Sequence, residues 1–132
     1  MEKITKKYLN RHVYGRDWEK IEVTDFDLNS VDTKDITGIY FSEKTILIND
    51  DGSEKILNEE KCSPIYHIGV RLSVNEAIEL LKNDPKSLNY FQNILANNPN
   101  VSVCKTDFGY LEFIFPGDMT LEEYKETKNN TK

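Results

Sequence analysis

Residues 73–81, SVNEAIELL, mark the point where the chain changes from strand-like to helical periodicity. Ser73 and Glu76 have the spacing of a capping box, in which a hydroxyl and a carboxylate each accept a backbone N–H at the start of a helix. Apolar residues then recur at positions 74, 77, 78 and 81, which places them on one face of a helix. The stretch therefore predicts a helix that packs one face against another element.

A second helix is predicted directly after the first. Asp84 precedes Pro85, which combines a favourable N-cap residue with a proline at the first helical position. Leu88, Phe91 and Leu95 form its apolar stripe, and the sequence Asn-Asn-Pro at residues 97–99 ends it.

The residues before this helical pair read mainly as strands. Residues 4–11 are the exception, since Ile4 and Tyr8 would share one face of a short amphipathic helix. Residues 18–28 predict a strand with a bulge near residues 24–25, because the apolar positions change phase there. Residues 36–41, 45–48 and 54–57 predict a meander with a tight turn at residues 49–52, and residues 64–70 predict a further strand that bends at Gly69.

The residues after the helical pair predict a hairpin and a last helix. Residues 101–106 and 110–115 alternate in polarity around a turn at residues 107–109. Thr120 and Glu123 repeat the capping-box spacing, and residues 128–132 are expected to fray. The predicted fold is a single α+β domain over residues 1–132, with a mostly antiparallel sheet (meander plus C-terminal hairpin), two central helices on one face and a short C-terminal helix.

The composition indicates the cellular environment in which we expect the protein. The 132 residues are 38% hydrophobic and 30% charged, and no uninterrupted apolar run approaches the roughly 18 residues of a membrane span. The charged N-terminal segment is not followed by an apolar run, so we expect a cytoplasmic protein that is neither secreted nor membrane-bound. Cys62 and Cys104 would then remain reduced thiols.

The net charge of −6 is distributed unevenly. Residues 1–20 carry six Lys/Arg and three Asp/Glu, whereas residues 21–60 carry three and eleven. Such an acidic block repels nucleic acid and anionic membranes and favours a basic protein surface, although it can also be a solvated surface without a partner. The residues that we expect to contact a partner are Asp25, Asp27, Asp32, Asp35, Asp50, Asp51, Glu54, Glu59, Glu60, Tyr14 and Trp18.

No motif for a cofactor or a metal ion is present in the sequence. The six glycines are scattered singly, so no phosphate-binding turn is predicted, and Asp107-Phe108-Gly109 is interpreted as a hairpin turn. Two cysteines and two histidines lie too far apart in the sequence to indicate a zinc site. Asp25 and Asp27 would share one side of a regular strand and could hold magnesium, but such a pair is more often a solvated sheet edge. We expect no cofactor and no metal.

A catalytic site is indicated only weakly, by three residues ahead of the first helix. His67 and Arg71 place an imidazole and a guanidinium near its N-terminus, and Cys62 would be the nearest thiol. Catalysis by Cys62 and His67 would require the chain to turn at Pro64. The alternative is that His67 packs in the sheet or is exposed to solvent, while Arg71 pairs with a nearby carboxylate.

Two classes of function remain. The first is a non-catalytic acidic binding module, such as an inhibitor or immunity-type protein that docks on a basic partner, including one that imitates nucleic-acid charge to occupy a nucleic-acid-binding protein. The second is a small intracellular enzyme with a site around His67. Direct binding of nucleic acid is disfavoured, since only residues 1–20 combine basic and aromatic side chains. The acidic block favours the first class.

Overall fold

The computed structural model describes residues 1–130, and residues 131 and 132 lie outside the described part of the chain. The chain forms two compact units, Met1–Ile65 and Tyr66–Lys132. The expectation of one domain over residues 1–132 stays a prediction. Of the tail expected to fray, residues 128–130 belong to the last helix and the remaining two lie outside the described residues.

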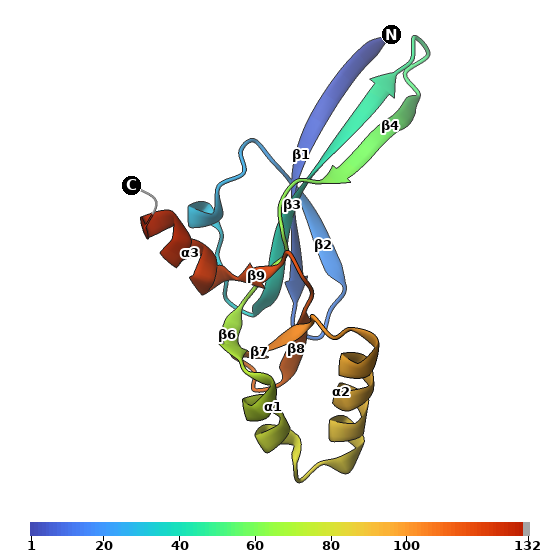
Figure 1. The fold of residues 1–132 in the computed structure, drawn as a ribbon. Coiled ribbons are helices and arrows are strands. Elements are labelled where there is room, and N and C mark those ends of the chain that lie inside the picture. The colour runs from blue at the N-terminus through green and yellow to red at the C-terminus, as the bar shows by residue number, and fades with distance from the viewer. Residues whose placement is uncertain (131–132) are drawn as a thin grey trace. The chain divides into compact units, whose positions relative to one another are not determined.

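The first unit is an antiparallel sheet in the order β2-β1-β3-β4 (Figure 1). Its strands are β1 (Glu2–Val13), β2 (Trp18–Val23), β3 (Ile36–Ile48) and β4 (Glu54–Lys61), with a 3-10 turn, η1, at Leu28–Ser30. The strand β3 pairs with β1 along nearly its whole length, and β4 pairs with the second half of β3. The predicted turn at residues 49–52 closes β3 and β4, with Gly52 at a φ of 86°.

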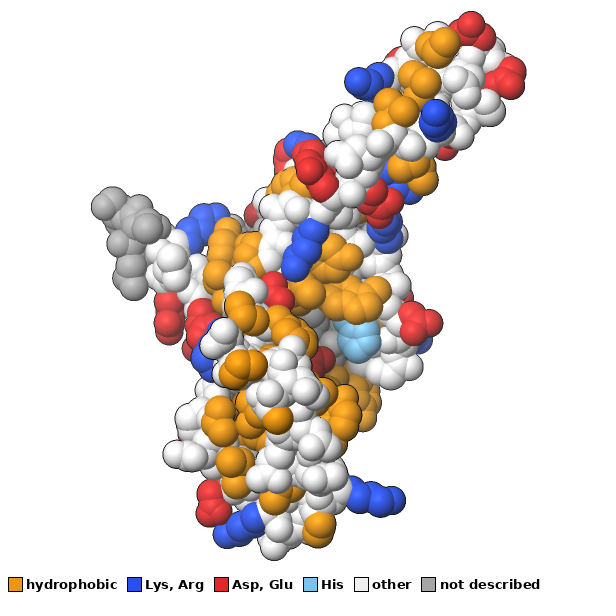
Figure 2. Space-filling view, turned by 45° about the vertical axis from the view of Figure 1, so that its right-hand side comes forward, with side chains coloured by type: hydrophobic (Ala, Val, Ile, Leu, Met, Phe, Trp, Pro, Cys, Tyr) orange, Lys and Arg blue, Asp and Glu red, His pale blue; other side chains and the backbone are white. Residues whose placement is uncertain are grey.

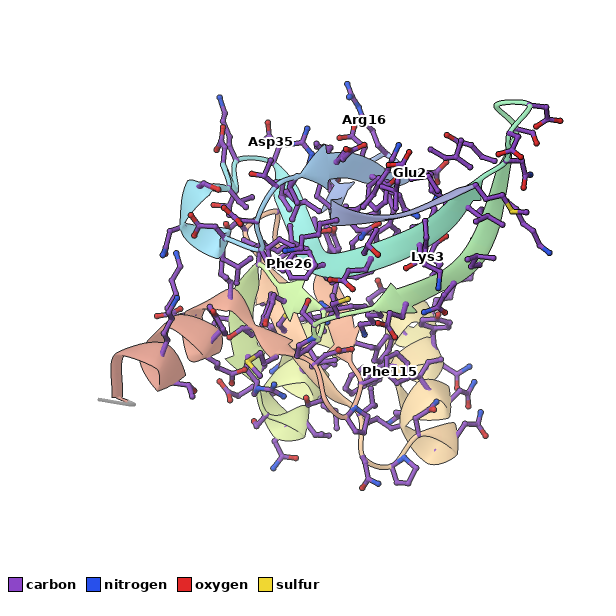
Figure 3. The ribbon with its side chains drawn as sticks, turned by 90° about the horizontal axis from the view of Figure 1, so that it is seen from above. Glu2, Lys3, Arg16, Phe26, Asp35 and Phe115 are labelled. Carbon is purple, nitrogen blue, oxygen red and sulfur yellow. The ribbon has the colours of Figure 1, made fainter. Side chains whose placement is uncertain are left out.

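The prediction of a helix over residues 4–11 was wrong, because these residues lie in β1. The segment pairs with β3 along its whole length and with β2 from Lys7 onward, and Leu9 is buried. Side chains of neighbouring residues in β1 point to opposite faces of the sheet, as Glu2 and Lys3 illustrate (Figure 3). Pairing across the sheet therefore overrides the local helical spacing.

Two strand boundaries also differ from the prediction. Residues 36–48 form one strand, because the polar residues 42–44 continue the ladder with β1 instead of turning. The strand predicted over residues 18–28 ends at Val23. Phe26 then stacks on Phe41 at 4.9 Å between ring centroids, and Leu28 is buried. These two apolar residues, which the prediction placed in the second half of the strand, therefore belong to a folded loop.

The second unit combines two small β-structures with three helices. Its strands are β5 (Tyr66–His67), β6 (Gly69–Leu72), β7 (Ser102–Thr106), β8 (Leu111–Ile114) and β9 (Met119–Thr120), and its helices are α1 (Val74–Leu81), α2 (Pro85–Asn97) and α3 (Leu121–Asn130). The strands β6, β7 and β8 form an antiparallel sheet, and β5 pairs with β9 in parallel. The predicted C-terminal hairpin is confirmed, with Gly109 at a φ of 89°.

The helix starts are those that the sequence predicted. The Ser73 hydroxyl and the Glu76 carboxylate each accept a backbone N–H of the other residue, which completes the capping box of α1. Asp84 accepts the Ser87 N–H and caps α2, and Thr120 and Glu123 form a second reciprocal pair at the start of α3.

The helices α1 and α2 pack on one face of the β6-β7-β8 sheet. Ala77 of α1, Phe91 of α2 and Val103 of β7 form the buried centre of this core, and partly buried residues such as Leu81 and Phe113 surround it. The α+β prediction, with mostly antiparallel sheets, two central helices and a short C-terminal helix, is confirmed. Among the described residues, no helix is both long and apolar enough to span a membrane.

Candidate functional site

The polar face of the β6-β7-β8 sheet carries His67's partner residues. Alternation along the strands sends Val103 toward the helices and places Cys104, Arg71 and Glu112 on the opposite face, where they occupy directly paired positions. His67 from β5 joins this group, and its Nδ1 lies 3.1 Å from Oε1 of Glu112. The second unit therefore brings an imidazole, a thiol, a carboxylate and a guanidinium together from four strands.

His67 is largely enclosed in this group. The residue is 8% exposed, and Nε2 is inaccessible to solvent without a hydrogen-bond partner among the described atoms. If Nδ1 carries the ring proton, it donates a hydrogen bond to Glu112, and Nε2 then carries the lone pair. A buried polar atom without a partner costs about 1–3 kcal/mol, so this nitrogen calls for an explanation in terms of a ligand, an ion or a chemical role.

Cys104 lies beside His67 and is fully buried. Burial raises the pKa of the Cys104 thiol to about 12, and the negative charge of Glu112 acts in the same direction. Since the thiolate is the nucleophilic form, this thiol is inert as a nucleophile near neutral pH in the absence of a metal ion.

Arg71 is committed to Glu123 instead of to His67. Its Nε lies 2.7 Å from Oε2 and its Nη2 lies 3.0 Å from Oε1 of Glu123, and its Nη1 donates to the Ser102 hydroxyl. Hydrogen bonding to Arg71 holds the pKa of the Glu123 carboxyl below its ordinary value. These contacts agree with the alternative interpretation of the sequence, in which Arg71 pairs with a carboxylate.

Cys62 lies in the first unit, beside the carboxylates of Glu43 and Glu60. Desolvation of its sulfur and these two carboxylates raise the pKa of its thiol, although the residue is exposed. A raised pKa leaves less thiolate at neutral pH, so the surroundings of Cys62 do not activate it as a nucleophile.

Three of the predicted partner-binding carboxylates line one hollow of the first unit. Asp25, Asp27 and Asp32, named here the acidic hollow, lie in the loop between β2 and β3 around a volume of about 500 Å³ whose floor includes Leu9 and Phe41. Arg11 also reaches this hollow, but its Nε is bonded to Glu19 at 2.9 Å.

The loop that carries the acidic hollow is held in place by its own side chains. The Asp27 carboxylate accepts the Asn29 N–H at 3.0 Å, and the Asp32 carboxylate accepts the Lys34 N–H at 3.0 Å. Phe26, labelled in Figure 3, anchors the loop on Phe41. The carboxylates are therefore displayed from an ordered backbone. Asp25 and Asp27 do not lie on one side of a regular strand, because the strand ends at Val23.

Asp35 and Tyr14 lie next to each other at the end of this loop. The Tyr14 N–H donates to the Asp35 carbonyl at 3.0 Å, and Asp35 adopts a φ of 64°, an uncommon conformation for a residue other than glycine. Tyr14 is 53% exposed.

The other predicted carboxylates lie elsewhere in the first unit. Asp50, Asp51 and Glu54 form a second group, named here the hairpin tip, which contributes acidic side chains at the turn between β3 and β4 (Figure 2). Asp50 is bonded to the N-terminal ammonium at 2.8 Å. Glu59 and Glu60 belong to β4, and Glu59 pairs with Lys20 at 2.5 Å. The eleven carboxylates of residues 21–60 are therefore spread over several places.

Trp18 lies on the sheet face opposite to Leu9, among rings and lysines. Its ring packs 5.5 Å from His12 and 5.2 Å from Tyr40, and Lys61 lies 5.8 Å from the Tyr40 ring. Trp18 therefore does not share a surface with the acidic hollow, and half of its area is covered by neighbouring side chains of the sheet.

Comparison with protein-family models, curated proteins and solved structures finds no match for this chain.

The group of His67, Cys104 and Glu112 was not predicted from the sequence. Its members come from positions 67, 104 and 112, and no short spacing joins them. The alternation of residues 111–115 and the hairpin turn at 107–109 could have placed Cys104 and Glu112 on the same face, but nothing in the sequence aligns β5 with them.

Proposed function

We propose that this chain is a non-catalytic, acidic protein-binding module that docks on a basic surface of another protein. The observation that carries this proposal is the acidic hollow, in which Asp25, Asp27 and Asp32 surround one concavity. Inhibitors and immunity-type proteins act in this manner, and a partner that binds nucleic acid would offer a suitable basic surface.

The charge of the loop supports this proposal. Residues 24–35 contain four aspartates and one lysine, and the nearby Arg11 is balanced by Glu19. The excess of negative charge is therefore available to an external cation, in contrast to Glu59 and Asp50, which already have cationic partners.

The order of the loop supports the proposal for a second reason. Each bond that fixes the loop reduces the conformational entropy lost when a partner binds, and so improves affinity without adding a contact. Phe26, Leu28 and the two carboxylate-to-backbone bonds supply this preorganisation. Tyr14 beside Asp35 adds an exposed aromatic ring at the edge of the loop, and such rings are enriched at binding hot spots.

We also propose a cytoplasmic location, where Cys62 and Cys104 would remain reduced thiols.

The experiment that tests the proposal is a pull-down with the purified chain at two salt concentrations. A partner held by exposed charges should be retained at low salt and released as ionic strength rises, because the Debye length falls from about 10 Å at 0.1 M to about 3 Å at 1 M. Retention that is absent, or equal at low and high salt, would contradict it.

A second candidate function is a small enzyme in which His67 acts as a base. The favouring observation is the contact of Nδ1 with Glu112, which orients the imidazole and leaves Nε2 for a proton. The inert thiol of Cys104 counts against a cysteine nucleophile. This candidate requires an activity that His67→Ala abolishes while circular dichroism shows an intact fold.

A further inference from the structure

We propose that His67, Cys104 and Glu112 form a binding site for a divalent transition-metal ion of the zinc class. The proposal is independent of docking through the acidic hollow, since all three residues belong to the second unit.

The geometry of the three side chains suits one ion. Their potential ligand atoms, one from each residue, all lie within 4.8 Å of one another, and the imidazole and carboxylate are already 3.1 Å apart. Ligand atoms around a tetrahedral zinc ion lie about 3.3–3.6 Å apart, as follows from metal–ligand distances of about 2.0–2.3 Å. The group can therefore close around an ion by small side-chain rotations.

The mixture of donor atoms selects the class of ion. A thiolate and an imidazole favour zinc and its neighbours in the first transition series, whereas magnesium and calcium prefer oxygen ligands only. Three protein ligands leave a fourth tetrahedral position for water or another ligand.

The charges of the three groups also suit a divalent cation. Coordination releases the Cys104 proton to solvent, so the bound site would contain one thiolate, one carboxylate and one neutral imidazole. These two negative charges balance a dication, which lowers the cost of keeping an ion at a buried position.

The two ring nitrogens of His67 have different surroundings, and Nδ1 is the one that lies against Glu112. Nε2 is inaccessible to solvent and has no hydrogen-bond partner among the described atoms, in a residue that is more than nine-tenths buried. For all three residues to bind one ion, Nδ1, the nitrogen that faces Glu112, is the ring nitrogen that would coordinate it. Nε2 would then carry the ring proton.

The other cysteine provides a matched control. Glu43, Glu60 and Cys62 also lie within reach of one ion, but Glu60 and Cys62 are exposed and the group contains no imidazole. Cys62→Ser therefore removes the same functional group as Cys104→Ser from a place where we expect no binding.

The test is a titration of the chelator-treated chain with Co²⁺, which reports thiolate ligation by an intense near-ultraviolet absorption. We expect one Co²⁺ per chain, displacement of the absorption by Zn²⁺, its loss in Cys104→Ser and its retention in Cys62→Ser. His67→Gln and Glu112→Gln should weaken Co²⁺ binding at least about tenfold.

Several results would overturn the site. Absence of the thiolate absorption in the wild-type chain would do so, as would its loss in Cys62→Ser with retention in Cys104→Ser. If circular dichroism shows that Cys104→Ser does not fold, Glu112→Gln decides the matter, because Glu112 is only partly buried; unchanged Co²⁺ affinity in a folded Glu112→Gln variant would refute the proposal.

Discussion

Arg71 and Glu123 form a two-point contact that joins β6 to the first turn of α3, with nitrogen–oxygen distances of 2.7 and 3.0 Å. The same carboxylate accepts the Thr120 N–H, so one side chain both caps the helix and fixes it to the sheet. The planar guanidinium matches a carboxylate in a way that an ammonium cannot.

We predict that Arg71→Lys lowers the free energy of unfolding by about 1 kcal/mol, because one of the two contacts is lost at a partly exposed position. Urea denaturation would measure this change in the free energy of unfolding. Glu79→Gln, which removes an exposed ion pair with Lys82 at the end of α1, is the control and should change stability by less than about 0.5 kcal/mol. Equal effects of the two variants would show that the Arg71 contact has no special geometry.

The capping box of α1 should make stability depend on pH. Hydrogen bonds from Ser73 hold the pKa of Glu76 below its ordinary value of 4.5, so the ionised form is favoured in the folded state. Its contribution is complete above the unfolded-state pKa and is lost as the pH falls through the lower folded-state pKa. We expect Glu76→Gln to reduce the decline in urea stability between about pH 5 and about pH 3, relative to the wild-type chain. Parallel declines in both proteins would contradict this role.

The core under α1 and α2 should depend on Phe91. This ring is 2% exposed and stacks on Phe113 at 5.8 Å, so Phe91→Ala should cost about 3–5 kcal/mol through lost burial and a cavity. Leu80→Ala on the same helical pair removes a side chain that is 54% exposed and should cost less than about 1 kcal/mol. Thermal unfolding followed by circular dichroism distinguishes the two variants. Similar unfolding midpoints for both variants would contradict a central role of Phe91 in this core.

Gly69 should tolerate no side chain. A Cβ there would lie 2.4 Å from the Lys105 carbonyl oxygen, and the φ of 155° is one that residues with side chains rarely adopt. We expect Gly69→Ala to cost about 2–4 kcal/mol, whereas Gly109→Ala, with open space around its Cβ, should cost about 1 kcal/mol for its positive φ alone. The two unfolding free energies measured side by side test the close approach of β6 and β7, and a cost at Gly69 no larger than at Gly109 would argue against it.

Local signals predicted the second unit well because they are self-contained. Ser73 with Glu76, Asp84 with Ser87, and Thr120 with Glu123 each fix a helix start through hydrogen bonds between residues three positions apart. The hairpin turn at Gly109 is equally local.

The first unit was predicted less accurately because its strands depend on distant partners. Ile4 and Tyr8 suit one face of a helix, but residues 39–46 and 19–23 supply the ladders that make their segment a strand. Phe26 and Leu28 continue an apolar pattern, yet Phe26 stacks on Phe41 and Leu28 is buried in a loop that has left the sheet.

The candidate sites also combine features that are local in the sequence with features that depend on long-range contacts. The acidic character of residues 21–60 is visible in the sequence, whereas the gathering of Asp25, Asp27 and Asp32 around one hollow depends on how the loop folds. The contact between His67 and Glu112 joins residues 45 positions apart and depends on the placement of β5.

Docking through the acidic hollow is tested most directly by comparing two variants with the same change in charge, using the partner retained in the pull-down. One is Asp25→Asn, Asp27→Asn, Asp32→Asn, which neutralises the hollow while asparagine can still accept the backbone bonds of the loop. The other is Asp50→Asn, Asp51→Asn, Glu54→Gln at the hairpin tip.

We predict that the hollow variant weakens binding roughly 3- to 140-fold at low salt, as three exposed charge pairs of about 0.2–1 kcal/mol each imply, and that the tip variant stays close to the wild-type affinity. Equal losses in the two variants, or none in the hollow variant, would contradict the account.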